Sequence, residues 1–532
     1  MDDTQAFSDE ERRALAPYFT NLDGPVFALR NLPEVVKGAL FARYSRSAKS
    51  LRRLFLDEFL EQVGSAQVTT EVGVQRADKL YERVFDDYGD DSVAQLGGAH
   101  LACEGASNIL TKVLEWGRLM AYLEQSTRYI AYNDQRRGRW KYLVPAEIEP
   151  TELCRRYTAC LDGAFETYAR WIEPVEAHYR AKYPQQPGDA DGVYRRTIRA
   201  KALDTLRGLL PAATQSNVGL YGTGQAYEAL LLRMRVHALE EVRQYADLML
   251  TELRQVIPSF LKRVDRPDRG GRWSQYMRET REATEELAPR VLAHITPEPR
   301  AEVVLTDYDP DGEVKVIAAA LYAVSDLPDD QLLRRAREMS AEQRTDVLHA
   351  YVGRRENRRH KPGRAFERTS YRFDVLTDYG AFRDLQRHRL LTLEWQPLSP
   401  RHGYGIPETI REVGALPDWE RVMNESAELH DAVCAAGSPQ VASYAVSMAY
   451  RVRFYMDLNA REAMHMIELR TAPAGHPSYR RVCQAMHRLI AEHAGHRAIA
   501  AAMTFADHSV VELERLQAER AGEQRRRQRS SA

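Results

Sequence analysis

The stretch QRHRLLTLEWQPLSPR, residues 386–401, places three basic residues side by side and then a series of hydrogen-bonding groups. Neighbours on an α-helix point about 100° apart, so Arg387, His388 and Arg389 cannot share one helix face. The triplet therefore favours a helix end or tight turn, where such groups converge on phosphate. Two prolines downstream prevent a long helix, and Ser399 and Arg401 lie in the resulting loop. The sequence predicts a shaped loop for an anionic ligand such as a nucleotide; a charged surface helix is the ordinary alternative.

Length and charge limit the classes of protein that this chain can be. Its 532 residues exceed one ordinary hydrophobic core, which predicts two domains or slightly more. A net charge of −1 provides no general attraction to nucleic acid or to a membrane surface, so any anion site must be local. No apolar run is long enough for a transmembrane helix, and the acidic start MDDTQAFSDEERRAL does not resemble a signal peptide.

The five cysteines show no C-x-x-C pair and no zinc spacing, which favours reduced thiols in a cytoplasmic protein. The histidine-rich stretch 476–496 has helical spacing without nearby carboxylates, so no metal is predicted. His465 is interpreted as a core histidine rather than as a ligand. No Ser–His–Asp arrangement follows from residue order, and no residue is assigned as catalytic.

An internal repeat organises the chain. Residues 114–129, LEWGRLMAYLEQSTRY, are followed by RGLLP and then by LRMRVHALEEVR. In the second half, residues 386–401 are followed by GSPQ and then by LRTAPAGHPSYR. The same order of segments predicts two similar folds packed about a pseudo-twofold axis.

The remaining patterns suggest boundaries. Helical periodicity dominates residues 1–264, and Ser8 is a candidate N-cap for the first helix. The Pro-, Gly- and charge-rich segment 265–300 is predicted to be a linker. Residues 301–321 carry two β-branched runs around Asp-Pro-Asp-Gly, which indicates a hairpin or a strand–turn–helix. The second repeat is predicted to span 301–515, and the basic tail 516–532 to be disordered.

Two further groups of polar residues are candidate binding elements. Glu124, Gln125, Ser126 and Arg128 offer an acceptor, an amide, a hydroxyl and a bidentate cation, which together can hold a pyrimidine edge and a phosphate. A helix C-terminus with routine polar residues is the alternative for this group. Asn459 and Arg461 begin the second group and indicate helix capping or contact with a cofactor ring.

Together these strings resemble the flavin-dependent thymidylate synthases (ThyX). That family carries an R-H-R followed by polar residues that end in Glu-x-Ser-x-Arg, and later an Asn-x-Arg segment leading to Leu-Arg. Here RHRLLTLEWQPLSPR and NAREAMHMIELRTAPAGHPSYR match in the second half, where Arg480 stands at the final arginine. The first half matches as EWGRLMAYLEQSTRY and LRMRVHALEEVR. The chain is similar to a tandem, diverged pair.

The resemblance implies a helix-rich α+β fold made of two repeats, each with long helices packed on a small β-sheet. It implies methylation of dUMP to dTMP with FAD as cofactor, and with methylenetetrahydrofolate and NADPH as co-substrates. Since the family forms a tetramer, two of these chains would form a homodimer. No nucleic acid or membrane partner is expected.

The departures from the family pattern suggest that the repeats divide the work. The first repeat keeps the family's dUMP-binding positions as Glu124, Ser126, Arg128, Arg207 and Arg243, with Gln125 beside them. The second repeat keeps the positions that face the flavin, Arg387, His388, Arg389, Asn459 and Arg461. Its nucleotide element is longer by two residues and holds Ser399 and Arg401; Gly437 is taken to stand where the first repeat has Arg207. We therefore expect composite sites between the repeats.

Two alternatives remain open at this point. The longer second motif is compatible with a related flavin-dependent modification of a pyrimidine nucleotide. The loss of R-H-R in the first repeat, which reads Trp116-Gly117-Arg118, is compatible with a non-catalytic nucleotide-binding scaffold.

Overall fold

The computed structural model describes residues 7–23, 29–34, 36–37, 40, 49–60, 95–128, 130–149, 151–187 and 189–509. The predicted disordered tail lies outside these residues. The chain forms two compact units that interleave along the sequence. Unit 1 contains residues 1–106, 117–124 and 217–295, and unit 2 contains 107–116, 125–216 and 296–532.

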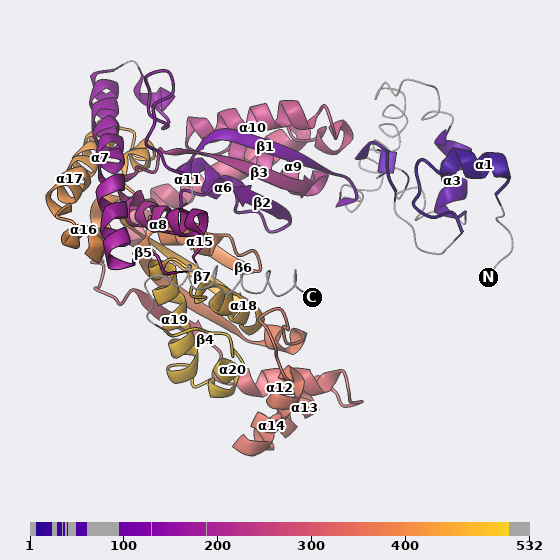
Figure 1. The fold of residues 1–532 in the computed structure, drawn as a ribbon. Coiled ribbons are helices and arrows are strands. Elements are labelled where there is room, and N and C mark those ends of the chain that lie inside the picture. The colour runs from indigo at the N-terminus through magenta and orange to yellow at the C-terminus, as the bar shows by residue number, and fades with distance from the viewer. Residues whose placement is uncertain are drawn as a thin grey trace. The chain divides into compact units, whose positions relative to one another are not determined.

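Unit 1 contains most of a small sheet whose strand order is β1-β3-β2 (Figure 1). Strands β2 and β3 are antiparallel, with Met120 opposite Gly222 and Glu124 opposite Val218. The elements assigned mainly to this unit are α1 (Asp9–Leu15), α3 (Leu51–Glu58), β1 (Gly98–Ser107), β2 (Met120–Glu124), β3 (Gln215–Thr223), α9 (Gly224–Arg235), α10 (Glu240–Leu253), the 3-10 helix η5 (Pro258–Leu261), the π-helix η6 (Pro267–Gly271) and α11 (Arg272–Val291).

Unit 2 is built on a four-stranded antiparallel sheet of order β4-β5-β7-β6. Helices α15, α18 and α19 pack on this sheet, while α12, α13 and α14 gather together (Figure 1). The strands are β4 (Val303–Tyr308), β5 (Ser370–Asp378), β6 (Leu391–Trp395) and β7 (Arg451–Asn459). The helices are α6 (Asn108–Leu114), η3 (Ala146–Ile148), α7 (Glu152–Lys182), α8 (Asp191–Leu206), η4 (Arg207–Leu209), α12 (Gly312–Tyr322), α13 (Asp329–Glu338), α14 (Ala341–Val352), η7 (Arg364–Arg368), α15 (Tyr379–Gln386), η8 (Pro400–His402), α16 (Glu408–Glu412), α17 (Leu416–Ala435), η9 (Val441–Ala445), α18 (Ala460–Arg470), α19 (Pro477–Glu492) and α20 (Arg497–Ala501).

The core of unit 2 follows from alternation along its central strands. Side chains of a strand point alternately to opposite faces. In β5 and β7 every second residue is buried, including Phe373 and Val375 in one strand and Phe454 and Met456 in the other. Burial of this face against the helices provides the main driving force for folding of the unit.

The structure confirms the predicted helix-rich α+β class and two similar sets of elements. In the first set, β1 leads into α6 and β2, and β3 leads into α9; in the second, β5 leads into α15 and β6, and β7 into α18. The sheet orders β1-β3-β2 and β5-β7-β6 correspond, and β4 is an added edge strand. The predicted boundaries at residues 264 and 301 remain a prediction.

Capping explains why each of these strands turns directly into a helix. The residues at the four junctions, Ser107, Asp378, Thr223 and Asn459, each accept a hydrogen bond from the backbone N–H three residues later. Such a cap satisfies one of the unpaired N–H groups of the first helical turn. The same sequence device therefore fixes four equivalent junctions.

A short antiparallel pairing within unit 2 relates the two sets. Pro211 lies opposite Ser447. Ala212 N donates to Val446 O at 2.8 Å, and Met448 N donates to Leu210 O at 2.9 Å. Counted from the Pro211–Ser447 pair, these two bonds are the same contact with the roles of the repeats exchanged. The pairing therefore has a local pseudo-twofold axis through Pro211 and Ser447. Such an axis between the whole repeats remains a prediction.

Several expectations about local structure are corrected. The segment LYGTGQ, residues 220–225, lies in the region where helical periodicity was predicted to dominate, but it contains the end of β3 and the start of α9. The pairing also equates Arg207 with Ser443, because both lie four residues before the central pair; Gly437 is not its equivalent. For residues 301–321, the strand–turn–helix alternative is the one observed, as β4 and α12.

Two other local features can be compared with the sequence. The predicted cap at Ser8 is confirmed as a capping box with Glu11. The segment predicted as a linker, 265–300, contains η6 and the helix α11. Within the described ranges, no helix has both the length and the apolar character needed to cross a membrane.

Candidate functional site

The R-H-R triplet occupies the turn between α15 and β6, as its residue order predicts. Arg387 is the C-terminal cap of α15, and β6 begins at Leu391. In the antiparallel register Leu391 lies opposite Leu458 of β7, which ends one residue later at the cap of α18. The register therefore brings the triplet to the sheet edge where Asn459 and Arg461 begin α18.

A buried carboxylate lies among arginines beside this turn. Asp384, on α15, accepts a short hydrogen bond from Arg387. Its carboxylate also lies 3.6 Å from the Arg470 guanidinium and 3.9 Å from that of Arg207. Burial alone would raise the pKa of Asp384, but the positive charges of these arginines hold it well below its usual range. Asp384 is therefore ionised and joins arginines from both repeats.

Arg207 combines burial with unused hydrogen-bonding capacity. Its side chain is 5% exposed, and its NH2 group has no hydrogen-bond partner. A Cβ atom at Gly380 would lie 3.0 Å from this guanidinium, so the glycine at the start of α15 provides the space that the arginine needs. A buried donor without a partner is costly, which points to a ligand that completes it.

Arg128 is held at the edge of the same group. Its Nε donates to both carboxylate oxygens of Asp204 at 2.8 Å. Its NH1 lies 3.5 Å from the hydroxyl of Tyr479, and the Arg470 guanidinium lies 5.5 Å from the centre of the Tyr479 ring. We call Arg128, Arg207, Arg387 and Arg470, with Asp204 and Asp384, the arginine cluster.

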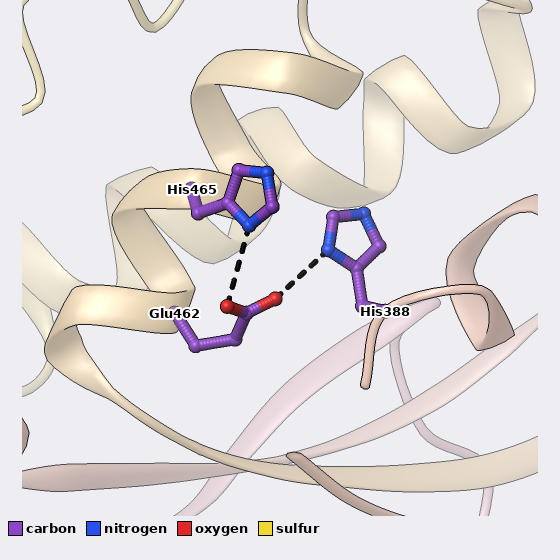
Figure 2. Close-up of side chains that lie close together, drawn as sticks. All are labelled: His388, Glu462 and His465. Carbon is purple, nitrogen blue, oxygen red and sulfur yellow. Dashed lines mark hydrogen bonds and ion pairs between the residues drawn. The ribbon is translucent and has the colours of Figure 1, made fainter. Parts of the chain in front are cut away.

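His388 forms a second group with Glu462 and His465 (Figure 2). Its Nδ1 lies 2.9 Å from Glu462, and His465 Nδ1 lies 3.3 Å from the other oxygen of the same carboxylate. Burial lowers the pKa of His388 to about 4, although Glu462 opposes the shift. Burial would raise the pKa of Glu462, but hydrogen bonds from both histidines lower it to about 2. Glu462 is therefore ionised and His388 neutral near pH 7.

A cavity of about 620 Å³ opens beside the cluster in unit 2. Asp204, Arg207 and His476 line it, together with Lys201 and Trp419. His476 caps α19 by accepting from Ser478 N, and burial lowers its pKa well below the usual range, with help from the charges of Arg207 and Arg128. The cavity is therefore lined by charged groups of both signs, including Arg207 and Asp204, and by apolar surface that includes the indole of Trp419.

The other predicted nucleotide-binding residues of the first repeat are divided between the two units. Gln125 Oε1 accepts from Lys141 at 3.2 Å, and Ser126 Oγ accepts from Arg128 N at 3.2 Å. Glu124 is buried at the end of β2. The structure does not support the alternative helix C-terminus here, because β2 is a strand. In unit 1, Arg243 donates to the carbonyls of His237 and Ala238 at 2.7 and 2.6 Å.

The residues of the second repeat that were predicted to bind the nucleotide or the flavin are partly engaged within the protein. Arg480 is buried and donates to Thr471 O at 2.9 Å and to the segment at Asp507. Arg461 donates to Pro362 O at 3.0 Å and to Glu367 at 3.3 Å. Arg389 is exposed, and Ser399 and Arg401 lie at the turn formed by η8.

Residue order did not identify several members of the site. Asp204, Asp384, Glu462, Arg470 and Tyr479 were not predicted, although Arg470 was noted as part of the repeated Leu-Arg. Asp384 lies one helical turn before Arg387, and Glu462 three residues after Asn459. Both spacings place side chains on a common helix face and were the available signals.

Comparison with known proteins agrees with the two sets of elements. The family described as Thymidylate synthase complementing protein matches residues 39–259 and 304–494. A UPF0159 protein of Chlamydia muridarum is 38% identical over 521 residues, covering 96% of this chain and 98% of the relative. A UPF0159 protein of Thermoplasma acidophilum is 29% identical, covering 91% and 97%.

Two similarities cover a smaller part of this chain. A flavin-dependent thymidylate synthase of Clostridium tetani is 23% identical over 203 residues, covering 38% of this chain and 75% of the relative. A solved UMP/dUMP methylase of Streptomyces cacaoi, bound to 5-bromo-dUMP, is 19% identical with a TM-score of 0.30. It covers 39% of this chain and 97% of its own.

Proposed function

This chain belongs to the family of thymidylate synthase complementing proteins, and from that premise we propose that it methylates dUMP to dTMP at composite sites formed by its two repeats. It is an enzyme of the flavin-dependent thymidylate synthase type. The proposed reaction uses FAD, with methylenetetrahydrofolate as carbon donor and NADPH as reductant, in the cytoplasm. The observation that carries the proposal is the buried, unpaired NH2 group of Arg207 at the wall of the cavity.

Charge in the arginine cluster supports a phosphate ligand. The cluster contains four guanidinium groups and two carboxylates, so it has an excess of two positive charges. A phosphate monoester near pH 7 carries a charge close to −2. Guanidinium groups present paired donors that match phosphate oxygens, and such charge-assisted bonds are stronger than neutral ones. A nucleoside monophosphate therefore suits the cluster.

The cavity has room for the rest of such a nucleotide. A volume of about 620 Å³ falls within the usual range for pockets that bind small molecules. Trp419 and Tyr179 provide flat apolar surface, and Thr409 and His476 provide polar atoms. Because His476 Nδ1 accepts from Ser478 N, the neutral ring carries its proton on Nε2, which can donate to the nucleotide without adding charge. Together they can accommodate a pyrimidine ring and its polar edge.

The residues at the α15–β6 turn fit a dinucleotide cofactor by their chemistry. Arg387, His388 and Arg389 lie at the sheet edge that also carries Asn459 and Arg461. The guanidinium groups of Arg389 and Arg461 suit the pyrophosphate of FAD, while Arg387 is held by Asp384 in the arginine cluster. When bound and reduced, the flavin supplies a hydride for the methylation.

The chain's own residues bind and orient rather than attack the substrate. Burial raises the pKa of Cys103, Cys160 and Cys483 to about 12, so these side chains remain thiols at neutral pH. A thiol is a poor nucleophile in comparison with a thiolate. The proposed contributions are phosphate capture by Arg128 and Arg207, orientation of the pyrimidine, and a site with little water in which charge interactions are strong.

A spectrum and a product analysis test the proposal. The purified protein is expected to absorb in the blue as a flavoprotein and to bind dUMP. With methylenetetrahydrofolate and NADPH it should convert dUMP to dTMP, measured by chromatography. A flavoprotein that binds dUMP but forms another product would place it in a related reaction, whereas absence of both flavin and nucleotide binding would make it a scaffold.

Oligomeric state forms a separate part of the proposal. Two repeats in one chain correspond to half of a four-repeat assembly, so we propose a homodimer. Sedimentation in the presence of FAD should give the mass of two chains, and a monomer mass would contradict this part.

A further inference from the structure

A chain of buried hydrogen bonds joins His388 of the R-H-R triplet to the arginine cluster. Glu462 lies 2.9 Å from His388 Nδ1, and Arg470 Nε donates to His388 Nε2 at 3.1 Å. Arg470 in turn lies 3.6 Å from Asp384. The side chains of His388 and Glu462 are 2% and 4% exposed, so little water can substitute for these partners.

The two contacts of His388 require one particular tautomer. Glu462 is ionised and can only accept, so His388 Nδ1 must carry the proton. Arg470 has no acceptor atom, so His388 Nε2 must present its lone pair to the arginine. Both requirements are met by the neutral ring with its proton on Nδ1.

We propose that Glu462 is a positioning residue: it fixes this tautomer of His388, and through it holds Arg470 in place for the phosphate of the nucleotide. The inference rests on the proposed function only in assigning the phosphate to the arginine cluster. A carboxylate bonded to one ring nitrogen commonly sets the role of the other nitrogen. The pKa of His388, near 4, agrees with a ring that stays neutral at physiological pH.

The same three side chains could be interpreted as a metal site. One ligand atom each from His388, Glu462 and His465 lie within 4.8 Å of one another, and no other such group occurs in the part of the chain that the structure describes. A metal on His388 Nδ1 would place the ring proton on Nε2, facing the N–H of Arg470. It would also bring a second cation close to that guanidinium. These two conflicts favour the positioning role.

Nitrogen-15 NMR of histidine-labelled protein tests the tautomer directly. Two-bond proton–nitrogen correlations distinguish a proton on Nδ1 from one on Nε2, and the signal lost in His388→Gln identifies the residue. We expect the Nδ1-protonated form in the wild type and a change toward the other tautomer in Glu462→Ala. A wild-type proton on Nε2 would overturn the proposal.

Binding of inorganic phosphate and of dUMP tests the connection to Arg470. Glu462→Ala should weaken both by about fivefold, as expected for one hydrogen bond. In an Arg470→Ala background the same substitution should have no further effect. Equal weakening in both backgrounds would overturn the proposal, because Glu462 would then act by another route.

Two further variants separate positioning from folding. Glu462→Gln can still accept from His388 Nδ1 and should retain the tautomer and near wild-type affinity. His465→Gln, which loses the other contact of Glu462 and a ring contact with His388 but leaves both hydrogen bonds of His388 in place, should leave phosphate affinity unchanged. If the wild type binds neither phosphate nor dUMP, the proposed function fails, and the NMR result alone then decides the tautomer.

Discussion

The two repeats differ at the positions that surround the arginine cluster. Counted from the caps of α6 and α15, Val113 stands where the second repeat has Asp384, and Trp116 where it has Arg387. In the other direction, the pairing at the pseudo-twofold axis makes Ser443 the positional equivalent of Arg207, so here it is the second repeat that lacks the arginine. The first repeat therefore has no acid at the position of Asp384 and no arginine at the position of Arg387.

The symmetry of the fold therefore does not extend to the chemistry of the two repeats. Counted from the caps of α9 and α18, Met234 stands where the second repeat has Arg470, and Ala226 where it has Glu462. Removing one member of a buried ion pair is costly, whereas replacing the whole group by apolar residues is tolerated. We therefore expect one phosphate-binding cluster per chain, although the fold has two equivalent places for it.

The largest expected effect comes from the acid that the first repeat lacks. Asp384→Asn leaves Arg207, Arg387 and Arg470 without their shared carboxylate. We expect a loss of about 3–5 kcal/mol in the free energy of unfolding, typical of breaking a buried ion pair. Denaturant titration measures the loss.

A bound anion should compensate for that substitution. Inorganic phosphate is expected to stabilise Asp384→Asn more than the wild type, because it replaces the missing negative charge. Val113→Ala, at the equivalent position, is the control and should show no added phosphate effect. A similar response in both variants would remove the distinction between the repeats.

Arg207→Ala should reduce the affinity for dUMP by roughly tenfold or more, since charge-assisted hydrogen bonds contribute about 1.5–3 kcal/mol each. The protein should retain its flavin colour, whereas His388→Ala should lose it. Calorimetry and absorbance measure the two effects. Ser443→Ala, the matched substitution across the axis, is expected to leave dUMP affinity unchanged; equal loss of flavin in Arg207→Ala and His388→Ala would refute the division of labour.

Stoichiometry tests the comparison without any mutation. Titration of the wild type with dUMP should saturate at one nucleotide per chain. Two equivalents of comparable affinity would mean that the apolar counterpart also binds, and that the missing charges do not decide binding.

Acid should weaken the fold through His388, with a smaller effect. Its pKa is near 4 in the folded protein and near 6.5 when unfolded, so the unfolded state binds more protons between these values. Stability is then lost as pH falls from about 6.5 to 4, by at most about 1.4 kcal/mol per pH unit. Glu462, with its pKa near 2, loses its contribution below that range.

Comparison with His388→Gln isolates this contribution. The variant should show a shallower loss of unfolding free energy between pH 6.5 and 4.5 than the wild type. Parallel curves would show that His388 is not held neutral by the fold.

Sequence alone predicted the features that depend on local chemistry. The turn at Arg387–Arg389, the cap at Asn459 and the order of the repeated segments follow from residue spacing, and all are present in the structure. The strand β3 was missed because its glycine- and polar-rich sequence has weak strand preference, and pairing with β2 supplies what its propensity lacks.

The buried partners in the site could not be predicted in the same way. Asp384, Glu462 and Arg470 resemble ordinary surface charges in a helical sequence. Their roles depend on the pairing of β6 with β7 and on the contact at Pro211 and Ser447, which bring distant segments together. Such long-range contacts leave no periodic signal in the chain.

The contact at Pro211 and Ser447 has a consequence for how the two halves can vary. In an assembly of identical chains, a substitution near a twofold axis always appears on both sides. Here the residues on the two sides are encoded by separate codons of one gene, so each can change while the other stays fixed. The covalent connection also keeps the halves at a high effective concentration, which makes their union independent of dilution. Asymmetry at this axis is therefore heritable without the assembly of two different subunits.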